Sequence, residues 1–323
     1  MSQFCFRLLK RLTYLLTGIG VNFKTHSAVC DRLHHLLDDK MAAPGNVATM
    51  DTRDEYFHAA VKVARKAGEE IKNAFTSEKR IQTKSSATDL VTETEEKVEK
   101  IIISTLKGKF PSHSFIGEES AAAGEKVELT DNPTWIIDPL DGTTNFVHGF
   151  PFVAVSIALS VNKEVVVGVV YNAILDQMFT GQLGKGAFMN GKPIRVSGQE
   201  DIKKCLLIGE LGKSRVKEKL DKVFSNLRAF YNEENKTHGC RVLGSPALDM
   251  CQVASGSGDA CYMFGAYGID VWDIAAGGLI VRESGGVVWD TTGGPFDMMS
   301  KRVLCASSEK LARTIAEGLT QMD

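Results

Sequence analysis

The sequence predicts a layered α+β protein, in which helices and strands mix without the regular strand–helix–strand repetition of a parallel α/β fold. Three observations lead to this prediction. Apolar residues recur at helical spacing in residues 51–111, β-branched runs dominate residues 114–190, and both patterns alternate after residue 205. No internal repeat or low-complexity linker divides residues 51–323. These residues are expected to form one folded unit, with residues 1–50 as a poorly ordered N-terminal extension.

Two helices are expected first. Asp51 or Thr52 would cap a helix that runs to about Phe75. Its apolar face would consist of Phe57, Ala60, Val61, Ala64, Ala67, Ile71 and Phe75. A polar stretch over residues 79–87 interrupts the helical pattern. A second helix follows and ends near residues 107–111, with an apolar face made of Val98, Ile101, Ile102 and Leu106.

Short strands are expected in the middle of the chain. Apolar or β-branched runs lie at residues 114–116, 134–137, 152–161, 164–171, 174–180 and 186–190. Asn162-Lys163 and Asn190-Gly191 are turn pairs that would join neighbouring strands. Later in the chain, strands are predicted at 205–208, 259–264, 287–289 and 303–305, and helices at 246–254, 273–283 and 309–319.

The composition excludes several classes of protein. The formal net charge is −2, so neither nucleic acid nor a strongly charged membrane surface is expected as a partner. The seven cysteines are scattered and include no Cys-x-x-Cys pair. This pattern supports neither a disulfide framework nor a zinc site, and it favours a reducing compartment such as the cytoplasm.

The N-terminal segment allows two interpretations. Residues 1–30 contain four basic residues and no acidic one, which is typical of a mitochondrial transit peptide. Their apolar run, residues 12–23, is shorter than the about 20 residues that span a bilayer. The interpretation we favour is a dispensable extension before a start at Met41 or Met50, because Met50 directly precedes the first predicted helix.

The most informative stretch is residues 135–145, with the sequence WIIDPLDGTTN. An apolar strand ends in Asp138, Pro139 forces a turn, and Asp141 follows three residues after the first carboxylate. Two carboxylates this close repel each other, and a hard cation with oxygen ligands is the usual compensation. Gly142 and Thr143 would open a helix whose free N–H groups face a phosphate. The alternative is a Pro-Asp-Gly turn followed by capping threonines.

Asp138 to Asn145 resembles the central motif of the inositol monophosphatases, a family of lithium-sensitive, magnesium-dependent phosphatases. Three further segments match the family in the same order: residues 84–95, 117–120 and 272–277. The resemblance covers residues 51–323. It implies the αβαβα sandwich of the inositol monophosphatase and fructose-bisphosphatase type, a homodimer, and magnesium-dependent hydrolysis of inositol monophosphates, with a phosphate monoester as the small-molecule partner.

The resemblance also implies roles for individual residues. Glu118, Asp138 and the carbonyl of Leu140 would bind one Mg²⁺, and Asp138, Asp141 and Asp273 a second. Glu95, Thr143 and Glu118 would be catalytic, with Glu95 and Thr143 orienting the attacking water. The substrate would contact Glu118, Leu140, Asp141, Gly142, Thr143, Gly244, Ser245, Pro246 and Asp273.

Several of these residues have simpler interpretations. Glu118 and Glu119 would otherwise be solvated loop acids, and Glu95 has capping-box spacing from Thr92. Asp273 would otherwise be a helix cap, with Asp270 as a rival metal ligand. We prefer Asp273 because it follows Trp272 and opens the predicted helix.

The chain also departs from the family pattern. Glu95 stands where the family usually has aspartate, and residues 262–270 lack the glutamate expected to bind inositol hydroxyls. Asp270 would be its substitute. Related substrates therefore stay open: sugar phosphates, nucleotide 3′-phosphates or inositol bisphosphates. A non-catalytic relative that binds metal or phosphate is the alternative from a different class.

Overall fold

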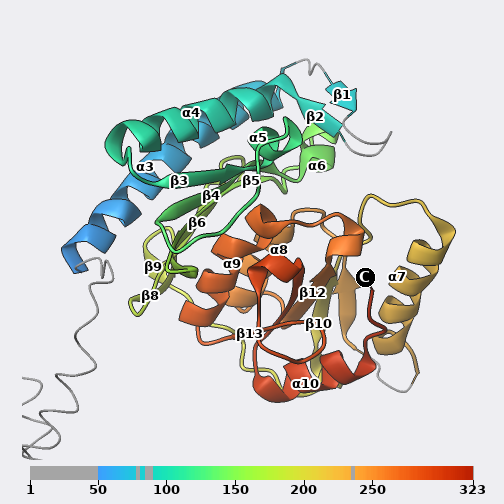
Figure 1. Ribbon diagram of the computed structural model, residues 1–323. Coiled ribbons are helices and arrows are strands. Elements are labelled where there is room, and N and C mark those ends of the chain that lie inside the picture. Colours follow the sequence, from blue (N-terminus) through green and yellow to red (C-terminus); the bar gives the residue numbers. More distant parts are fainter. Residues whose placement is uncertain (1–49, 78–80, 84–89, 234–236, 323) are drawn as a thin grey trace, which may run out of the picture. The chain divides into compact units, whose positions relative to one another are not determined.

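The computed structural model describes residues 50–77, 81–83, 90–233 and 237–322. Within them, a seven-stranded sheet and a five-stranded sheet alternate with three layers of helices (Figure 1). This arrangement confirms the predicted layered α+β class and the αβαβα sandwich. Among the described residues, no helix is long and apolar enough to cross a membrane.

The first helical layer consists of α3 (Met50–Phe75) and α4 (Glu93–Lys109), which lie side by side on one face of the seven-stranded sheet (Figure 1). A short antiparallel pair, β1 (Ile81–Thr83) and β2 (Leu90–Thr92), precedes α4. Residues at helical spacing on α3 are buried, from Ala60 to Ile71. α3 lies so close to the sheet that a Cβ on Gly68 would stand 2.4 Å from the ring of Tyr171.

The seven-stranded sheet keeps sequence order, with β3 and β4 parallel and every other neighbouring pair antiparallel. Its strands are β3 (Ser114–Gly117), β4 (Thr134–Asp141), β5 (Ala154–Val161), β6 (Glu164–Asn172), β7 (Gln177–Gln182), β8 (Gly186–Met189) and β9 (Lys192–Pro193). Helices cover both faces of its central strands, so these strands are continuous apolar runs. The register of β4 against β5 shifts between Asp138 and Asp141, where Pro139 cannot donate to the ladder.

The middle helical layer, α8 (Pro246–Ala254) and α9 (Val271–Glu283), packs between the two sheets. The five-stranded sheet has the order β11 (Gly239–Arg241), β10 (Leu206–Gly209), β12 (Ala260–Phe264), β14 (Arg302–Ala306) and β13 (Val287–Trp289). Its other face is covered by α7 (Lys217–Phe230) and α10 (Glu309–Gly318), through a second apolar cluster (Figure 1). Shorter helices are α5 (Glu118–Ala122), α6 (Thr143–His148), η2 (Ile202–Lys204), η3 (Gly265–Tyr267) and η4 (Met298–Ser300).

One helix start was predicted wrongly. We expected a helix to open at Asp273, but α9 begins two residues earlier, at Val271, and Asp270 is its N-cap. The physical reason is a capping box, in which the Asp270 carboxylate accepts a backbone N–H of the first turn and the Asp273 carboxylate accepts the N–H of Asp270. In addition, α7 and β11 were not predicted.

The boundary near residue 50 stays a prediction, and so does that part of the predicted polar stretch (residues 79–87) which is not described. Residues 1–49 and 84–89 lie outside the described residues.

The contact between β6 and α9 generates a prediction about stability. A Cβ on Gly168 would stand 2.7 Å from the backbone oxygen of Ala276, and neither backbone can shift freely inside two packed layers. We expect Gly168→Ala to lower the free energy of unfolding by about 1–3 kcal/mol, as overpacking does. Urea denaturation would measure this.

The matched control is Gly108→Ala on α4, where the position is exposed and no heavy atom lies within 4 Å of the added Cβ. That change should be neutral or stabilising by up to about 1 kcal/mol, because alanine is the better helix former. Equal stability of the two variants would contradict the proposed close packing.

Candidate active site

Three carboxylates meet where β4 ends and α9 begins. Asp138, Asp141 and Asp273 each place an oxygen within 4.8 Å of the others. All three are buried, with exposed fractions of 1%, 3% and 8%. Asp138 and Asp141 flank the irregular end of β4, and Asp273 lies in the first turn of α9. The structure thus brings together residues that are more than 130 positions apart in the sequence.

Burial raises the pKa of each of these carboxyl groups. The pKa of Asp138 is raised by burial first, and then by the charges of Glu118, Asp141 and Asp273. The pKa of Asp141 is raised by burial and by the charge of Asp273. Burial and the charge of Glu118 raise the pKa of Asp273 to about 7. The three groups therefore resist simultaneous ionisation unless a cation lies among them.

Asp141 also anchors the segment that leads into α8. Its Oδ2 accepts hydrogen bonds from the Ser245 hydroxyl at 2.5 Å and from the Ala247 N–H at 2.7 Å. On the other side of this segment, Asn145 Nδ2 donates to the carbonyl of Leu243 at 2.7 Å. These bonds connect residues 243–247 to the end of β4, through Asp141, and to α6, through Asn145.

Thr143 and Glu95 form a second polar unit next to the carboxylates. The Thr143 hydroxyl donates to Glu95 Oε1 at 2.7 Å, and Glu95 is completely buried. Thr143 opens α6, and Gly142 precedes it with φ of +94°, a left-handed conformation that favours glycine. A Cβ on Gly142 would also stand 2.9 Å from the carbonyl oxygen of Phe152. The capping-box interpretation of Glu95 stays untested, because the side chain of Thr92 lies outside the described residues.

Glu118 approaches the three carboxylates from the end of β3, the strand that pairs with β4. It opens α5, directly after β3, and the register Gly117↔Ile137 places it beside Asp138. It lies outside the group of three within 4.8 Å, yet its charge raises the pKa of Asp138 and of Asp273. Glu119 lines a different hollow, on the side of α4. The solvated-loop interpretation therefore fits Glu119 better than Glu118.

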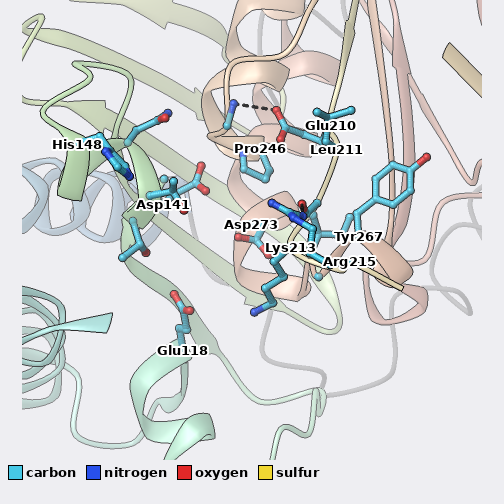
Figure 2. A pocket seen from close by; sticks show the side chains of 18 residues that line it. Glu118, Asp141, His148, Glu210, Leu211, Lys213, Arg215, Pro246, Tyr267 and Asp273 are labelled. Carbon is cyan, nitrogen blue, oxygen red and sulfur yellow. Dashed lines mark hydrogen bonds between the residues drawn. The ribbon is translucent and has the colours of Figure 1, made fainter. Parts of the chain in front are cut away.

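Most of the predicted residues line one cavity of about 420 Å³ (Figure 2). Predicted residues in its wall are Glu118, Asp141, Gly142, Thr143, Gly244, Pro246 and Asp273. Four predicted residues are buried and do not line the cavity: Glu95, Asp138, Leu140 and Ser245. The side chain of Ser245 is directed to Asp141 rather than into the cavity.

Sequence reasoning missed several residues of the wall. They are Thr144, Asn145, His148, Glu210, Leu211, Gly212, Lys213, Arg215, Tyr267, Gly268 and Ile269. Figure 2 shows Lys213 directed into the cavity, between Asp273 and Glu118. The segment that carries it follows β10 and packs on η3, where the Lys213 N–H donates to the carbonyl of Tyr267 at 3.0 Å. No motif in the sequence connects these two segments.

Asp270, the predicted rival ligand and substitute carboxylate, is occupied elsewhere. Its carboxylate accepts the Val271 N–H at 2.8 Å and pairs with Lys301 at 2.5 Å. It belongs neither to the three-carboxylate group nor to the cavity wall. Besides Glu118, Asp141 and Asp273, a fourth carboxylate lines the cavity: Glu210, which accepts the Gly244 N–H at 2.9 Å. Burial raises the pKa of Glu210.

Comparison with known proteins identifies the family of this chain. The family model "Inositol monophosphatase family" matches residues 52–322. Inositol monophosphatase 1 from cattle and from human are each 54% identical over 267 residues, which cover 83% of this chain and 95% of the relative. Human inositol monophosphatase 2 is 50% identical over 266 residues, covering 82% of this chain and 91% of the relative.

Solved structures agree in fold. An inositol monophosphatase from Thermotoga maritima superposes with a TM-score of 0.72 at 30% identity, covering 82% of this chain and 96% of that one. The suhB protein of Bartonella henselae gives a TM-score of 0.73 at 32% identity, covering 83% and 99%. By family match, by sequence identity and by fold, this chain belongs to the inositol monophosphatase family.

Proposed function

We propose that this protein is a phosphoric monoester hydrolase that converts inositol monophosphates to inositol and phosphate, with Mg²⁺ as its cofactor. The observation that carries the proposal is the group of three buried carboxylates beside a cavity, in a chain 54% identical to proteins named inositol monophosphatase 1. Family membership implies a divalent metal cofactor, and the donor set favours Mg²⁺.

The residues present suit such an ion. Carboxylate and carbonyl oxygens are the ligands that Mg²⁺ prefers, and the charge of buried carboxylates needs a cation nearby. In this proposal Glu118, Asp138 and the carbonyl of Leu140 hold one ion, and Asp138, Asp141 and Asp273 hold the second. When bound, the ions would polarise the phosphoryl group and activate water for in-line attack.

The cofactor also suggests how the protein is inhibited. Li⁺ would occupy the second position after turnover, with Asp141 and Asp273 as its ligands, and uncompetitive inhibition in steady-state kinetics would support this. Insensitivity to Li⁺ would argue against it.

Thr143 and Glu95 would orient the attacking water. Because the Thr143 hydroxyl gives its single proton to Glu95, its lone pairs remain available to accept a hydrogen bond from water. Burial keeps Glu95 away from competing solvent, so the Thr143 hydroxyl has one preferred direction. The backbone N–H groups of Gly142 and Thr143 would bind phosphate oxygens. Gly244 and Pro246 would contact the departing alcohol from the cavity wall.

Inositol monophosphate as the preferred substrate is also part of the proposal. Residues 262–270 contain no glutamate, and Asp270 is held by Val271 and Lys301. Sugar phosphates, nucleotide 3′-phosphates and inositol bisphosphates are therefore alternative substrates for the same chemistry. Turnover measured on a panel of these esters would rank them, and the highest kcat/KM on another ester would replace inositol monophosphate.

We also propose a catalytic domain over residues 51–323, a homodimer, and a cytoplasmic location. Light scattering of the purified protein would test the dimer, and a monomer mass would refute it.

The first prediction concerns Asp138, which would contact both ions. We expect Asp138→Asn to lower kcat on inositol monophosphate by far more than tenfold, because each tenfold corresponds to only about 1.4 kcal/mol and metal catalysis supplies several. The control is Asp131→Asn, at an exposed loop residue that precedes β4, and it should leave kcat unchanged. Activity of Asp138→Asn above about a tenth of wild type would refute the central role of Asp138. Wild-type protein inactive on every ester with Mg²⁺ would favour the non-catalytic alternative.

The second prediction concerns stability and pH. The raised pKa values of Asp138, Asp141 and Asp273 mean that the folded chain holds protons that the unfolded chain releases. Their stabilising contribution is complete below the ordinary carboxyl pKa of about 4 and is lost as pH rises, for Asp273 as pH approaches its raised pKa of about 7. Each tenfold difference in proton affinity between the folded and unfolded chain corresponds to about 1.4 kcal/mol of unfolding free energy. Metal-free protein should therefore lose stability over this range, as denaturant titrations at several pH values would show.

Mg²⁺ should offset this loss, because it binds the deprotonated carboxylates. The gain in unfolding free energy on adding Mg²⁺ should be larger at pH 7.5 than at pH 5. An equal gain at both pH values, or none, would contradict the assignment of these three carboxylates to the metal.

A further inference from the structure

Two buried glutamates lie one turn apart on α4. Glu95 and Glu99 are at positions i and i+4 and therefore share a face of the helix. Glu95 accepts the hydroxyl proton of Thr143, as described above. Glu99 has no part in the proposed reaction, yet it is only 4% exposed. A buried carboxylate needs hydrogen-bond donors, so its partners indicate what it does.

The partners of Glu99 belong to the first turn of α5. Glu99 Oε2 accepts the backbone N–H of Glu119 at 2.8 Å. Its Oε1 accepts the backbone N–H of Ser120 at 2.8 Å and the hydroxyl of Ser120 at 2.6 Å. The residue at the N-cap of α5, Gly117, has no side chain to offer. Glu99 therefore does from α4 what an N-cap side chain does within its own helix.

Gly117 makes this contact possible. A Cβ at Gly117 would stand 2.6 Å from the carboxyl carbon of Glu99, which is closer than real Cβ contacts allow. Glu99 thus touches the residue before Glu118 and bonds to the two residues after it. One carboxylate therefore contacts the backbone on both sides of Glu118.

The direction of Glu118 matters because this residue stands slightly apart. It lines the same cavity as Asp141 and Asp273 (Figure 2), but it lies outside the group within 4.8 Å. α5 has only five residues, so little else in the helix resists a tilt. A small rotation of this turn would carry the Glu118 carboxylate away from Asp138.

We propose that Glu99 is a positioning residue for metal binding: by capping α5 from α4 it holds Glu118 towards the ion beside Asp138. The proposal rests on the metal role proposed above for Glu118. In this proposal one face of α4 positions two residues of the site: Thr143 through Glu95, and Glu118 through Glu99 and α5.

The test is Glu99→Gln, which keeps one acceptor oxygen but turns an N–H donor towards the donors of α5. The readout is the Mg²⁺ concentration that half-saturates metal-free protein, measured by isothermal titration calorimetry. We expect this concentration to increase about tenfold, the usual lower effect of losing a residue that orients a metal ligand. At saturating Mg²⁺, kcat should return to within about threefold of wild type, since the ligands themselves remain. Glu99→Asp, which cannot reach α5, should not rescue metal binding.

The matched control is Glu96→Gln on the same helix, where the side chain is exposed and pairs with Lys100 at 3.6 Å. It should leave the Mg²⁺ midpoint unchanged. If Glu99→Gln does not fold, Ser120→Ala removes one of the three bonds and should shift the midpoint in the same direction by a smaller factor.

An unchanged Mg²⁺ midpoint in the folded Glu99→Gln variant, or in Ser120→Ala if that variant alone folds, would overturn the proposal. So would equal shifts in Glu99→Gln and Glu96→Gln. Failure of the proposed function is distinguishable, because the wild-type protein would then show no Mg²⁺ binding in the titration and no turnover.

Discussion

The mutual repulsion of three buried carboxylates is the constraint on which this site depends. Asp138, Asp141 and Asp273 are held within 4.8 Å by elements that cannot separate without breaking the fold. The end of β4 is fixed by its two neighbouring strands, and α9 is packed between the two sheets. The free energy of folding therefore offsets the cost of holding like charges together. A divalent cation would lower that cost on binding and so stabilise the folded chain.

The surrounding contacts follow from that arrangement. The first-layer helix α4 reaches both sides of the site, through Glu95 to Thr143 and through Glu99 to α5. The middle layer reaches it through the hydrogen bonds between Asp141 and the start of α8. A third contribution to the cavity wall comes from residues 210–215, which follow β10, and from η3. Every layer except that of α7 and α10 thus leads to residues of the site, which suits a site that needs fixed oxygen ligands.

How much the sequence predicted depended on the range of each interaction. Asp138 to Thr143 lie on a strand, a turn and a helix start whose signals are local, so their proximity was predictable. The start of α9 was misplaced because Asp270 and Asp273 are both acceptable caps, and only the capping box distinguishes them. α7 was missed because its charged sequence hides a weak apolar face around Val223 and Phe230. Glu99 and Glu210 bond to backbone 20 to 34 residues away, and nothing local reveals such partners.

The most direct test of the account is the position of the ions. Mn²⁺ prefers the same oxygen ligands as Mg²⁺ and can be located in crystals by its anomalous scattering. The account predicts an anomalous peak between Asp138, Asp141 and Asp273, with a second beside Glu118. Ordered Mn²⁺ elsewhere, or none at these carboxylates in crystals of protein that Mn²⁺ activates, would contradict it.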